Sequence, residues 1–424
     1  MSILIKDVLL DGKVTSAYIE DNRISELGRK IEADTMIDGK KKVLLPGLVN
    51  AHTHAAMTLL RSYADDMILQ EWLETRIWPA EKMLTREDIY IGTKLACLEM
   101  IKSGTTCFND MYFHMDMAAK AVQEMGLRAI LCEGFIDRMD KNAGEEMLGP
   151  TRKITEKIAK LGSPRIKPAW GPHATYTVST DSLKTFRQLS DETGYPIHMH
   201  LSETRKEVDD CQKDFGKSPV NYLESIGFLN GQCIFAHGVW LKPDEMSTLA
   251  KRRAKVVHNP VSNMKLSVGK AMPYADLMKA GVQISLGTDG AASNNNLDMF
   301  QTLKAAALLQ KFAADDQTIA SAKEIWDLGT LGGAKTLGLD AGVVREGGLA
   351  DLILVDLTKV FMVPNHNLYS NLVYAASGDC VDTTICDGKI LMTGRRVRGE
   401  DETIDEASKA AKNLARRVSD GQSR

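Results

Sequence analysis

The sequence predicts an α/β protein: a (β/α)8 TIM barrel with a small β-sandwich domain built from both ends of the chain. Three observations predict this fold. Eight short apolar runs alternate with amphipathic segments through the middle of the chain. Segments rich in β-forming residues, separated by turn formers, lie at both ends. The 424 residues suffice for a barrel of about 250 residues and a second, smaller unit.

The small β domain is expected from the two ends of the chain. Asp11-Gly12 and Asp21-Asn22 are turns between β-rich runs, and Asp387-Gly388 marks a hairpin. The charged, alanine-rich end predicts a solvated surface helix. We divide the chain into 1–44 and 339–398 for the β domain, 45–338 for the barrel and 399–424 for a helical tail. The expected strands of the β domain are Ile3–Ile5, Val14–Ile19, Arg23–Leu27, Ala350–Leu354, Asp382–Cys386 and Lys389–Met392.

The barrel is expected to place its chemistry at the carboxyl ends of its strands. Apolar residues at a spacing of three to four predict intervening helices such as Arg86–Lys102, Asp181–Thr193 and Asp244–Ala250. The long connection Ser62–Met83, which contains two tryptophans, is predicted to form a lid over these strand ends. The expected strands are Leu44–His54, Thr105–Tyr112, Ala129–Ile136, Ile166–Thr175, Pro196–Glu203, Cys233–Val239, Lys255–Asn259 and Gln283–Asp289.

Composition excludes several classes of function. Lys and Arg number 53 against 56 Asp and Glu, a net charge of −3, so the chain has no basic excess for nucleic acid or an anionic membrane. No uninterrupted apolar stretch reaches the length of about 18 residues that a transmembrane helix needs. The seven cysteines form no C-x-x-C pair, and the first residues lack the pattern of a signal peptide. We therefore expect a cytoplasmic protein with reduced thiols.

The histidines are few but unevenly placed. Of nine, five fall at the ends of predicted strands: His52, His54, His173, His200 and His237. Residues two apart on a strand share a face, so His52 and His54 are expected to aim at one point, while His200 and Asp289 end the fifth and eighth strands. Three imidazoles and a carboxylate suit Zn²⁺ or Fe²⁺ with one position open for water. A lone H-x-H is weak, but its coincidence with His200 and Asp289 predicts a metal site.

Three residues beside this site are candidates for proton transfer. Glu203 is expected to carry a proton between water and a substrate nitrogen, and Asp289 to accept the proton of an attacking water. A zinc ion would lower the pKa of that water to about 7. His237 is expected to orient the attacking water or to stabilise developing charge. The other histidines are interpreted as core or surface residues, with His258 as a support for the site; they are His114, His198, His258 and His366.

A series of motifs runs in order over nearly the whole chain. They are Pro46-Gly47-Leu48-Val49-Asn50-Ala51-His52-Thr53-His54, Ala64-Asp65-Asp66, Glu71-Trp72-Leu73, Trp78-Pro79-Ala80-Glu81, Gly104-Thr105-Thr106, His198-Met199-His200-Leu201-Ser202-Glu203-Thr204, Ala236-His237-Gly238, Asn259-Pro260-Val261-Ser262-Asn263-Met264-Lys265-Leu266 and Gly287-Thr288-Asp289-Gly290. With them the sequence closely resembles the amidohydrolase superfamily of metal-dependent hydrolases, and within it the 5-methylthioadenosine/S-adenosylhomocysteine deaminase group. The terminal β segments match that family's composite second domain.

The resemblance implies one zinc per subunit, held by His52, His54, His200 and Asp289, and hydrolytic deamination of an adenine ring. In that scheme Glu203 handles the ring-nitrogen proton, Asp289 the water proton, and His237 positions the attack. It also implies that Glu81 hydrogen-bonds the ribose hydroxyls and that His173 contacts the nucleoside. The expected activity is that of an aminohydrolase acting on a cyclic amidine, in salvage of nucleosides left by S-adenosylmethionine chemistry.

The 5′ side of the substrate is where this chain departs from the resemblance. Members acting on S-adenosylhomocysteine can carry arginines after the third strand that grip its carboxylate, but Glu133 stands where one is expected. Arg138 and Arg152 lie nearby without a clear alignment. We therefore expect a compact 5′ end, as in 5′-deoxyadenosine, with 5′-methylthioadenosine also used and S-adenosylhomocysteine and adenosine as further candidates.

Other interpretations stay open. Guanine deaminase and triazine chlorohydrolase would keep the same metal residues, and Glu81 is what favours a nucleoside. A binuclear site would need a lysine at the end of the fourth strand, whereas Lys167 comes too early. A catalytically dead barrel used for binding or assembly would have no reason to keep every ligand together with Glu203 and His237. A homo-oligomer, a dimer or a tetramer, is expected from the type of enzyme.

Overall fold

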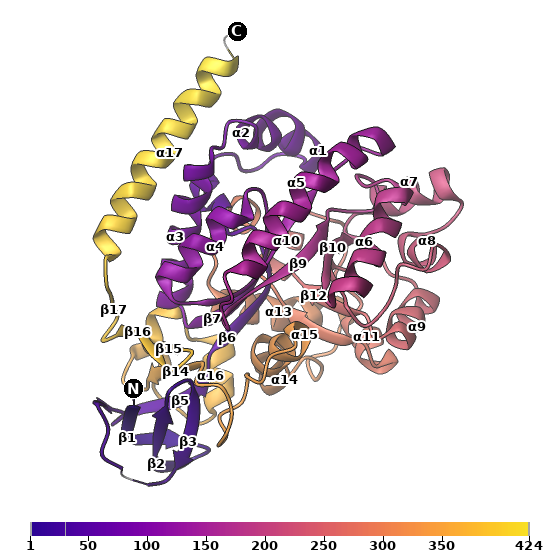
Figure 1. The fold of residues 1–424 in the computed structure, drawn as a ribbon. Coiled ribbons are helices and arrows are strands. Elements are labelled where there is room, and N and C mark those ends of the chain that lie inside the picture. Colours follow the sequence, from indigo (N-terminus) through magenta and orange to yellow (C-terminus); the bar gives the residue numbers. More distant parts are fainter. Residues whose placement is uncertain (1, 30, 423–424) are drawn as a thin grey trace.

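The computed structural model describes residues 2–29 and 31–422 and contains two β-sheets (Figure 1). One is an eight-stranded parallel sheet with helices around it, and the other is a nine-stranded mixed sheet at one end of the molecule. The predicted α/β barrel with a separate β domain is therefore confirmed.

The parallel sheet follows the order of the chain and curls into a nearly closed barrel. Its first and last strands meet where the backbone N–H of Asp289 donates to the carbonyl of His52 at 3.0 Å and the Asn50 side chain bonds Thr288. The strands are β6 (Leu48–Thr53), β7 (Thr105–Tyr112), β8 (Arg128–Phe135), β9 (Ile166–Pro172), β10 (Ile197–Leu201), β11 (Cys233–His237), β12 (Lys255–His258) and β13 (Gln283–Leu286).

The first predicted strand, Leu44–His54, is wrong as a single element. The chain forms β5 (Lys42–Pro46) in the mixed sheet and then β6 in the barrel, with Gly47 between them. A Cβ on Gly47 would lie 2.2 Å from Oγ1 of Thr106, so only glycine lets the chain pass this close to β7. The apolar run continues through the change of sheet because residues on both sides of Gly47 are buried.

Helices cover the outside of the barrel and begin at identifiable caps. The helix α3 begins after Thr85, which forms a capping box with Asp88, and α6 begins after Ser179, whose hydroxyl accepts from the N–H of Ser182. The helices from the one before the second barrel strand onward are α3 (Arg86–Lys102), α4 (Met115–Met125), α5 (Lys141–Lys160), α6 (Thr180–Thr193), α7 (Arg205–Phe215), α8 (Pro219–Ser225), α9 (Pro243–Arg252), α10 (Pro260–Lys265), α11 (Tyr274–Ala280), α12 (Ala291–Asn294), α13 (Met299–Ala314), α14 (Ala322–Asp327), η3 (Leu328–Gly332) and α15 (Gly333–Leu337).

The connection after β6 contains short helical turns. It runs from η1 (Ala55–Leu60) through α1 (Leu69–Trp72), η2 (Leu73–Ile77) and α2 (Trp78–Glu81) to the start of α3. Glu81, at the end of α2, accepts a hydrogen bond from the hydroxyl of Tyr112 at the carboxyl end of β7. This contact places the end of the segment at the face of the barrel where the strands end, as expected for a lid.

The mixed sheet combines both ends of the chain. Its strand order is β17-β16-β15-β14-β5-β1-β2-β3, with β4 paired to β1. Arg128 of the barrel joins the two sheets through a buried bidentate pair with Asp351, at 2.8 and 3.1 Å. The remaining elements are β1 (Ser2–Leu10), β2 (Lys13–Glu20), β3 (Arg23–Leu27), β4 (Thr35–Asp38), β14 (Leu352–Asp356), η4 (Val360–Met362), α16 (Leu368–Tyr374), η5 (Gly378–Cys380), β15 (Val381–Cys386), β16 (Lys389–Thr393), β17 (Arg396–Val397) and α17 (Glu400–Gln422).

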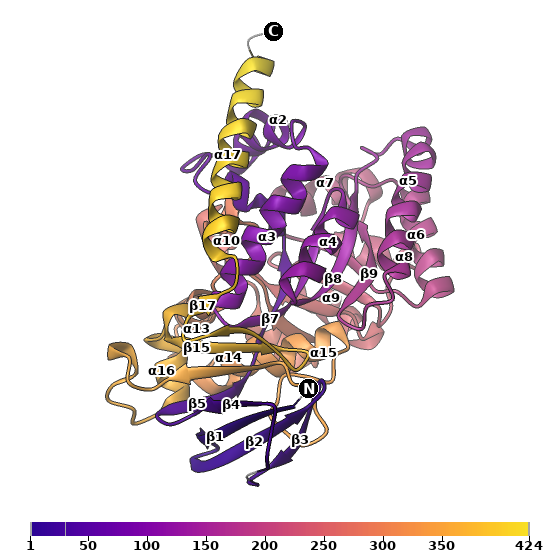
Figure 2. The same ribbon diagram turned by 60° about the vertical axis from the view of Figure 1, so that its left-hand side comes forward.

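The C-terminal helix α17 lies along the barrel, and both views show it beside α3 with its end projecting past the body (Figures 1 and 2). The expectation of a solvated helix is wrong for one of its faces, which is buried. Its buried side chains, spaced three or four residues apart, are Thr403, Ala407, Ala410, Leu414 and Val418. The charged residues that dominate the sequence lie on the other face and hide this pattern.

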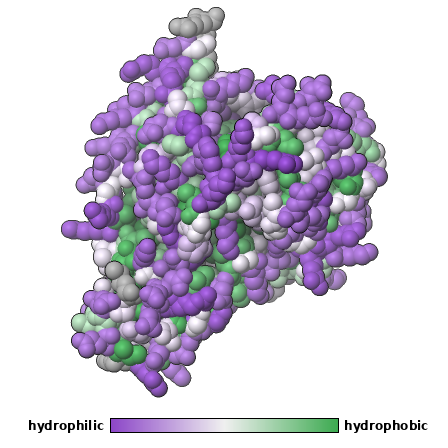
Figure 3. All heavy atoms as spheres, in the orientation of Figure 1, coloured by the Kyte–Doolittle hydropathy of each residue, from purple (hydrophilic) through white to green (hydrophobic). Residues whose placement is uncertain are grey.

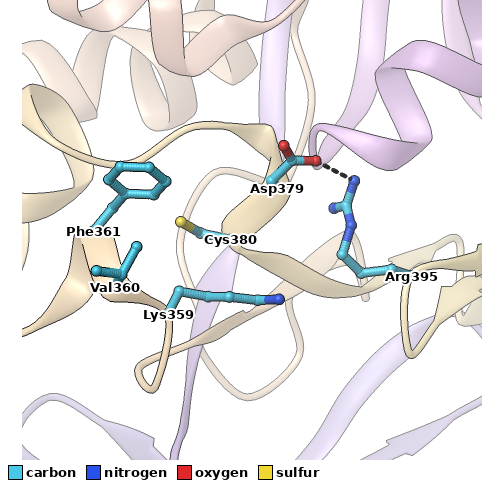
Figure 4. A pocket seen from close by; sticks show the side chains of 6 residues that line it. All are labelled: Lys359, Val360, Phe361, Asp379, Cys380 and Arg395. Atoms are coloured by element: carbon cyan, nitrogen blue, oxygen red, sulfur yellow. Dashed lines mark hydrogen bonds and ion pairs between the residues drawn. The ribbon is translucent and has the colours of Figure 1, made fainter.

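Hydrophilic side chains cover most of the face in Figure 3, with hydrophobic ones in scattered groups. A hollow of about 380 Å³ beside the mixed sheet is bordered by the Asp379–Arg395 ion pair and by Lys359, Phe361 and Cys380 (Figure 4). All seven cysteines are buried free thiols. Among the described helices, none combines the length and apolar character that crossing a membrane requires.

Candidate metal and catalytic site

The predicted metal ligands come together at the carboxyl ends of three barrel strands. His52 lies on β6 and His54 follows it, His200 lies on β10, and Asp289 follows β13. His52 is fully buried, and His200 and Asp289 are each 5% exposed. Residues nearly 240 positions apart are therefore brought to one point by the closure of the barrel.

Distances between the donor atoms fit one bound metal ion. Oδ1 of Asp289 lies 3.3 Å from Nε2 of His52 and 3.2 Å from Nε2 of His54, and Nε2 of His54 lies 3.3 Å from Nε2 of His200. Ligand atoms about 2.0–2.1 Å from a tetrahedral Zn²⁺ are about 3.3–3.4 Å apart. The buried Nε2 of His52 has no hydrogen-bond partner among the described residues. Donor set and spacing therefore fit a metal cofactor.

The opposite nitrogen of each imidazole is held by a fixed partner. Nδ1 of His54 lies 2.5 Å from the carbonyl of Met111, and Nδ1 of His200 lies 3.0 Å from the carbonyl of His173. Nδ1 of His52 lies 2.7 Å from Nε2 of His198. An N–H donated through Nδ1 leaves Nε2 as the ligand atom, as in metal sites whose outer partners fix the tautomer. His198, interpreted from sequence as a core residue, is one of these supports.

Asp289 is held with one carboxylate oxygen toward the histidines. The hydroxyls of Ser262 and Ser293 donate to its Oδ2 at 2.6 and 2.9 Å, so Oδ1 alone faces His52 and His54. Its backbone is left-handed, with φ of +63°, which is rare outside glycine. Such conformations persist where surrounding contacts enforce them, and they concentrate at functional sites.

Glu203 and His237 lie beside the cluster. Oε1 of Glu203 is 3.8 Å from Nδ1 of His237, which donates to Oδ1 of Asn263 at 2.8 Å. Burial raises the pKa of Glu203 above its ordinary value. The carboxylate of Glu207 accepts from the backbone N–H of Glu203 at 2.8 Å and so positions it. His237 also forms a second group of possible ligands with His52 and Asp289.

The two residues expected to contact the nucleoside also lie near the histidines. Glu81 reaches the site from α2, accepts from Tyr112 at 2.8 Å, and has its pKa raised by burial to about 7. The rings of Tyr112 and His54 lie 6.1 Å apart. The ring of His173 lies 4.6 Å from that of His200, and its Nδ1 bonds Thr177 at 3.0 Å.

Both carboxylate oxygens of Glu133 are occupied by hydrogen bonds within the protein. Its two oxygens accept from the backbone N–H groups of His114 and Met115 at 3.0 and 2.9 Å, so it caps the start of α4. Repulsion of a carboxylate tail is therefore not its evident role. Arg138 and Arg152 are exposed, and Lys167 is exposed near the start of β9, away from the site.

Several supporting residues were missed by sequence reasoning. Ser262 and Asn263 lie within the motif that begins at Asn259, but the motif does not indicate what they bond. In the structure Ser262 bonds Asp289 and Asn263 bonds His237. Ser293 and Glu207 each lie four residues after their partners, Asp289 and Glu203. The Thr204-x-x-Glu207 spacing is a helix-start pattern that could have indicated Glu207, whereas a lone serine gives no such signal.

The chain is similar to known proteins over nearly its whole length. The family described as "Amidohydrolase family" matches residues 43–391. The 5′-deoxyadenosine deaminase of Methanoregula boonei is 50% identical over 424 residues, covering 98% of this chain and 96% of that protein. The 5-methylthioadenosine/S-adenosylhomocysteine deaminase of Thermococcus sibiricus is 50% identical over 400 residues, covering 92% of this chain and 94% of that protein.

Solved structures show the same fold. An adenosine deaminase from Xanthomonas campestris with bound zinc superimposes with a TM-score of 0.91 at 33% identity, covering 98% of both chains. An atrazine chlorohydrolase from Arthrobacter aurescens superimposes with a TM-score of 0.87 at 21% identity, covering 96% of this chain and all of that one, a likeness of fold alone.

Proposed function

Since the chain belongs to the amidohydrolase family, we propose that it is a zinc-dependent hydrolytic deaminase of adenine nucleosides. Water replaces the exocyclic amine of the adenine ring, giving the inosine analogue and ammonia. The observation that carries the proposal is the convergence of His52, His54, His200 and Asp289 within 3.2–3.3 Å contacts beside Glu203. The chain resembles at 33% identity an adenosine deaminase solved with zinc, which supports that metal.

These four residues would hold the ion through Nε2 of each histidine and Oδ1 of Asp289. A bound Zn²⁺ supplies a water acidic enough to act as a nucleophile near neutral pH. The seryl hydroxyls on Oδ2 of Asp289 keep Oδ1 pointed at the histidines. Fixed outer partners of this kind are typically worth 10–100-fold in metal affinity.

Proton handling falls to three residues. Glu203, whose pKa is raised by burial, would hold a proton for the ring nitrogen next to the carbon under attack. Asp289 would accept a proton from the attacking water, and the departing amine takes up a proton to leave as ammonia. His237, held through Nδ1 by Asn263, would orient the water with its other nitrogen.

The substrate is proposed from the relatives and from Glu81. Relatives about 50% identical are named for 5′-deoxyadenosine or for 5-methylthioadenosine and S-adenosylhomocysteine. We propose 5′-deoxyadenosine and 5′-methylthioadenosine as the main substrates, with S-adenosylhomocysteine and adenosine as further candidates. Glu81 would accept the ribose hydroxyls and His173 would contact the nucleoside, a feature that guanine or a triazine could not use.

Ammonia release by zinc-loaded protein tests the proposal. We expect turnover of 5′-deoxyadenosine and 5′-methylthioadenosine, and loss of at least about 100-fold in kcat/KM for Glu203→Gln, in line with removal of a general acid. Guanine and a chlorotriazine serve as the competing substrates. Turnover of either of these in preference to every adenine nucleoside would overturn the proposal.

We also propose that the protein works in the cytoplasm as a homo-oligomer, a dimer or a tetramer. Seven buried free thiols support a reducing compartment. Light scattering on the purified protein would test the oligomeric state, and a monomeric mass at micromolar concentration would contradict it.

A further inference from the structure

The segment 62–83 is fastened near its start by a polar cluster that the proposed chemistry does not use. Nζ of Lys265 donates to Oδ1 of Asp65, to Oδ1 of Asn295 and, at 3.2 Å, to the carbonyl of Ala292. Nδ2 of Asn295 lies 3.4 Å from Oδ2 of Asp65, which closes the triangle. The side chains of Lys265 and Asp65 are 26% and 30% exposed, so water screens this pair only in part.

The three residues come from three different loops at the mouth of the barrel. Asp65 follows β6, Lys265 ends α10 after β12, and Asn295 caps α12 after β13 with φ of +71°. The cluster thus spans the seam where the barrel closes. Arg61 adds to it by donating to the carbonyl of Asn295.

The same two short helices that carry Lys265 and Asn295 also hold Asp289. Ser262 lies three residues before Lys265, and Ser293 lies two residues before Asn295. Asp289 keeps its own hydrogen bonds from Ser262 and Ser293, so loss of Lys265 is expected to open the segment without moving this proposed metal ligand.

Outside this cluster, mainly apolar contacts hold the segment. Trp72, Ile77 and Ala80 are its buried side chains, and most of the others are exposed or only partly buried. The partly buried apolar residues that pack on the core are Tyr63, Ala64, Met67, Leu69, Leu73 and Met83. The indole of Trp72 donates to the carbonyl of Ala64, next to Asp65, and Glu81 bonds Tyr112 at the far end. A segment with only three fully buried side chains opens more easily than the barrel helices, so polar contacts at its ends add to its closure.

We propose that Asp65, Lys265 and Asn295 form a latch that holds residues 62–83 closed over the site. Lys265 is then a positioning residue, because closing the segment brings Glu81 to the nucleoside. The statement that Glu81 meets a nucleoside rests on the proposed function. The latch itself does not, because its contacts lie within the free protein.

Hydrogen–deuterium exchange on the full-length zinc-loaded protein tests the latch directly. We expect Lys265→Met to raise amide exchange across residues 62–81 by about tenfold, with the rest of the barrel unchanged. The matched control is Lys270→Met, which removes a nearby lysine that lies over the ring of Trp240 and outside the latch. Asp65→Asn should raise exchange in the same residues by a smaller factor, because its amide oxygen can still accept from Lys265 although the ion pair is lost.

Kinetics supply a second readout. With 5′-deoxyadenosine we expect Lys265→Met to raise KM about tenfold while kcat changes less than about threefold, because binding is lost and the reacting groups stay in place. The double variant Asp65→Lys with Lys265→Asp should restore part of the protection by reversing the pair.

Unchanged exchange over 62–81 in both Lys265→Met and Asp65→Asn would overturn the latch, whatever the substrate. Exchange that rises along the whole chain in Lys265→Met would mean unfolding, and Asp65→Asn alone would then decide. If the unsubstituted protein turns over no nucleoside but the variants still lose protection in this segment, the proposed function is overturned and the latch is supported.

Discussion

At the scale of single residues, Glu133 shows how a residue's place in the sequence can mislead about its role. It follows the buried part of the third strand, where an arginine would read a carboxylate tail, yet both its oxygens bond the first amides of α4. Burial raises its pKa to about 7. Its negative charge is thus directed at a helix start, where it stabilises the exposed amides. Any preference for a compact 5′ group must come from other residues.

Glu133→Gln is therefore predicted to change stability more than specificity. The ratio of kcat/KM for 5′-deoxyadenosine over S-adenosylhomocysteine should stay within about twofold, because the substituted group faces α4. Urea unfolding should show a loss of about 1 kcal/mol from the weaker helix cap. A tenfold gain in the use of S-adenosylhomocysteine would show that Glu133 does repel the tail. Glu145→Gln, an exposed change on α5, is the control for both measurements.

At the scale of elements, the C-terminal helix contributes to the core through a face that its charge conceals. Leu414 is 2% exposed on α17, the helix that packs beside α3, and Arg417 donates to the carbonyl of Met83 at 3.2 Å. Leu414→Ala should lower the free energy of unfolding by about 2–4 kcal/mol, as for other buried leucines. Lys412→Ala, on the exposed face, should change it by less than about 0.5 kcal/mol. If urea unfolding shows the same small change in the free energy of unfolding for Leu414→Ala as for Lys412→Ala, the buried face of α17 does not contribute to the core.

What the sequence could predict at this scale depended on local signals. The expected helix Arg86–Lys102 matches α3 because its apolar residues recur every three to four positions and form its buried face. Most barrel strands lie within two or three residues of their expected bounds. The change of sheet at Gly47 carried no break in hydrophobicity, so one strand was predicted where two exist. The three histidines among the candidate ligands stand out because histidine is rare in this chain, whereas Asp289 and Ser293 belong to common residue types that carry no such signal.

At the scale of the whole molecule, the candidate metal site lies across the seam of the barrel. Its donor atoms come from β6, from β10 and from the loop after β13. The first strand, β6, and the last, β13, are joined here by few backbone hydrogen bonds. An ion bound by all four residues would tie the first strand to the last. The metal should therefore act on the stability of the barrel as well as on its chemistry.

Removal of metal is predicted to lower the melting temperature. Zinc at 100 times its Kd adds about 2.7 kcal/mol to the free energy of unfolding, provided that it binds only the folded chain. For a chain of this size that shift is a few degrees in calorimetry. His200→Asn should abolish the shift between zinc-loaded and chelated protein, whereas His366→Asn, at an exposed position, should keep it. A full shift in His200→Asn would place the ion elsewhere, because loss of one of four ligands cannot leave binding at this seam unchanged.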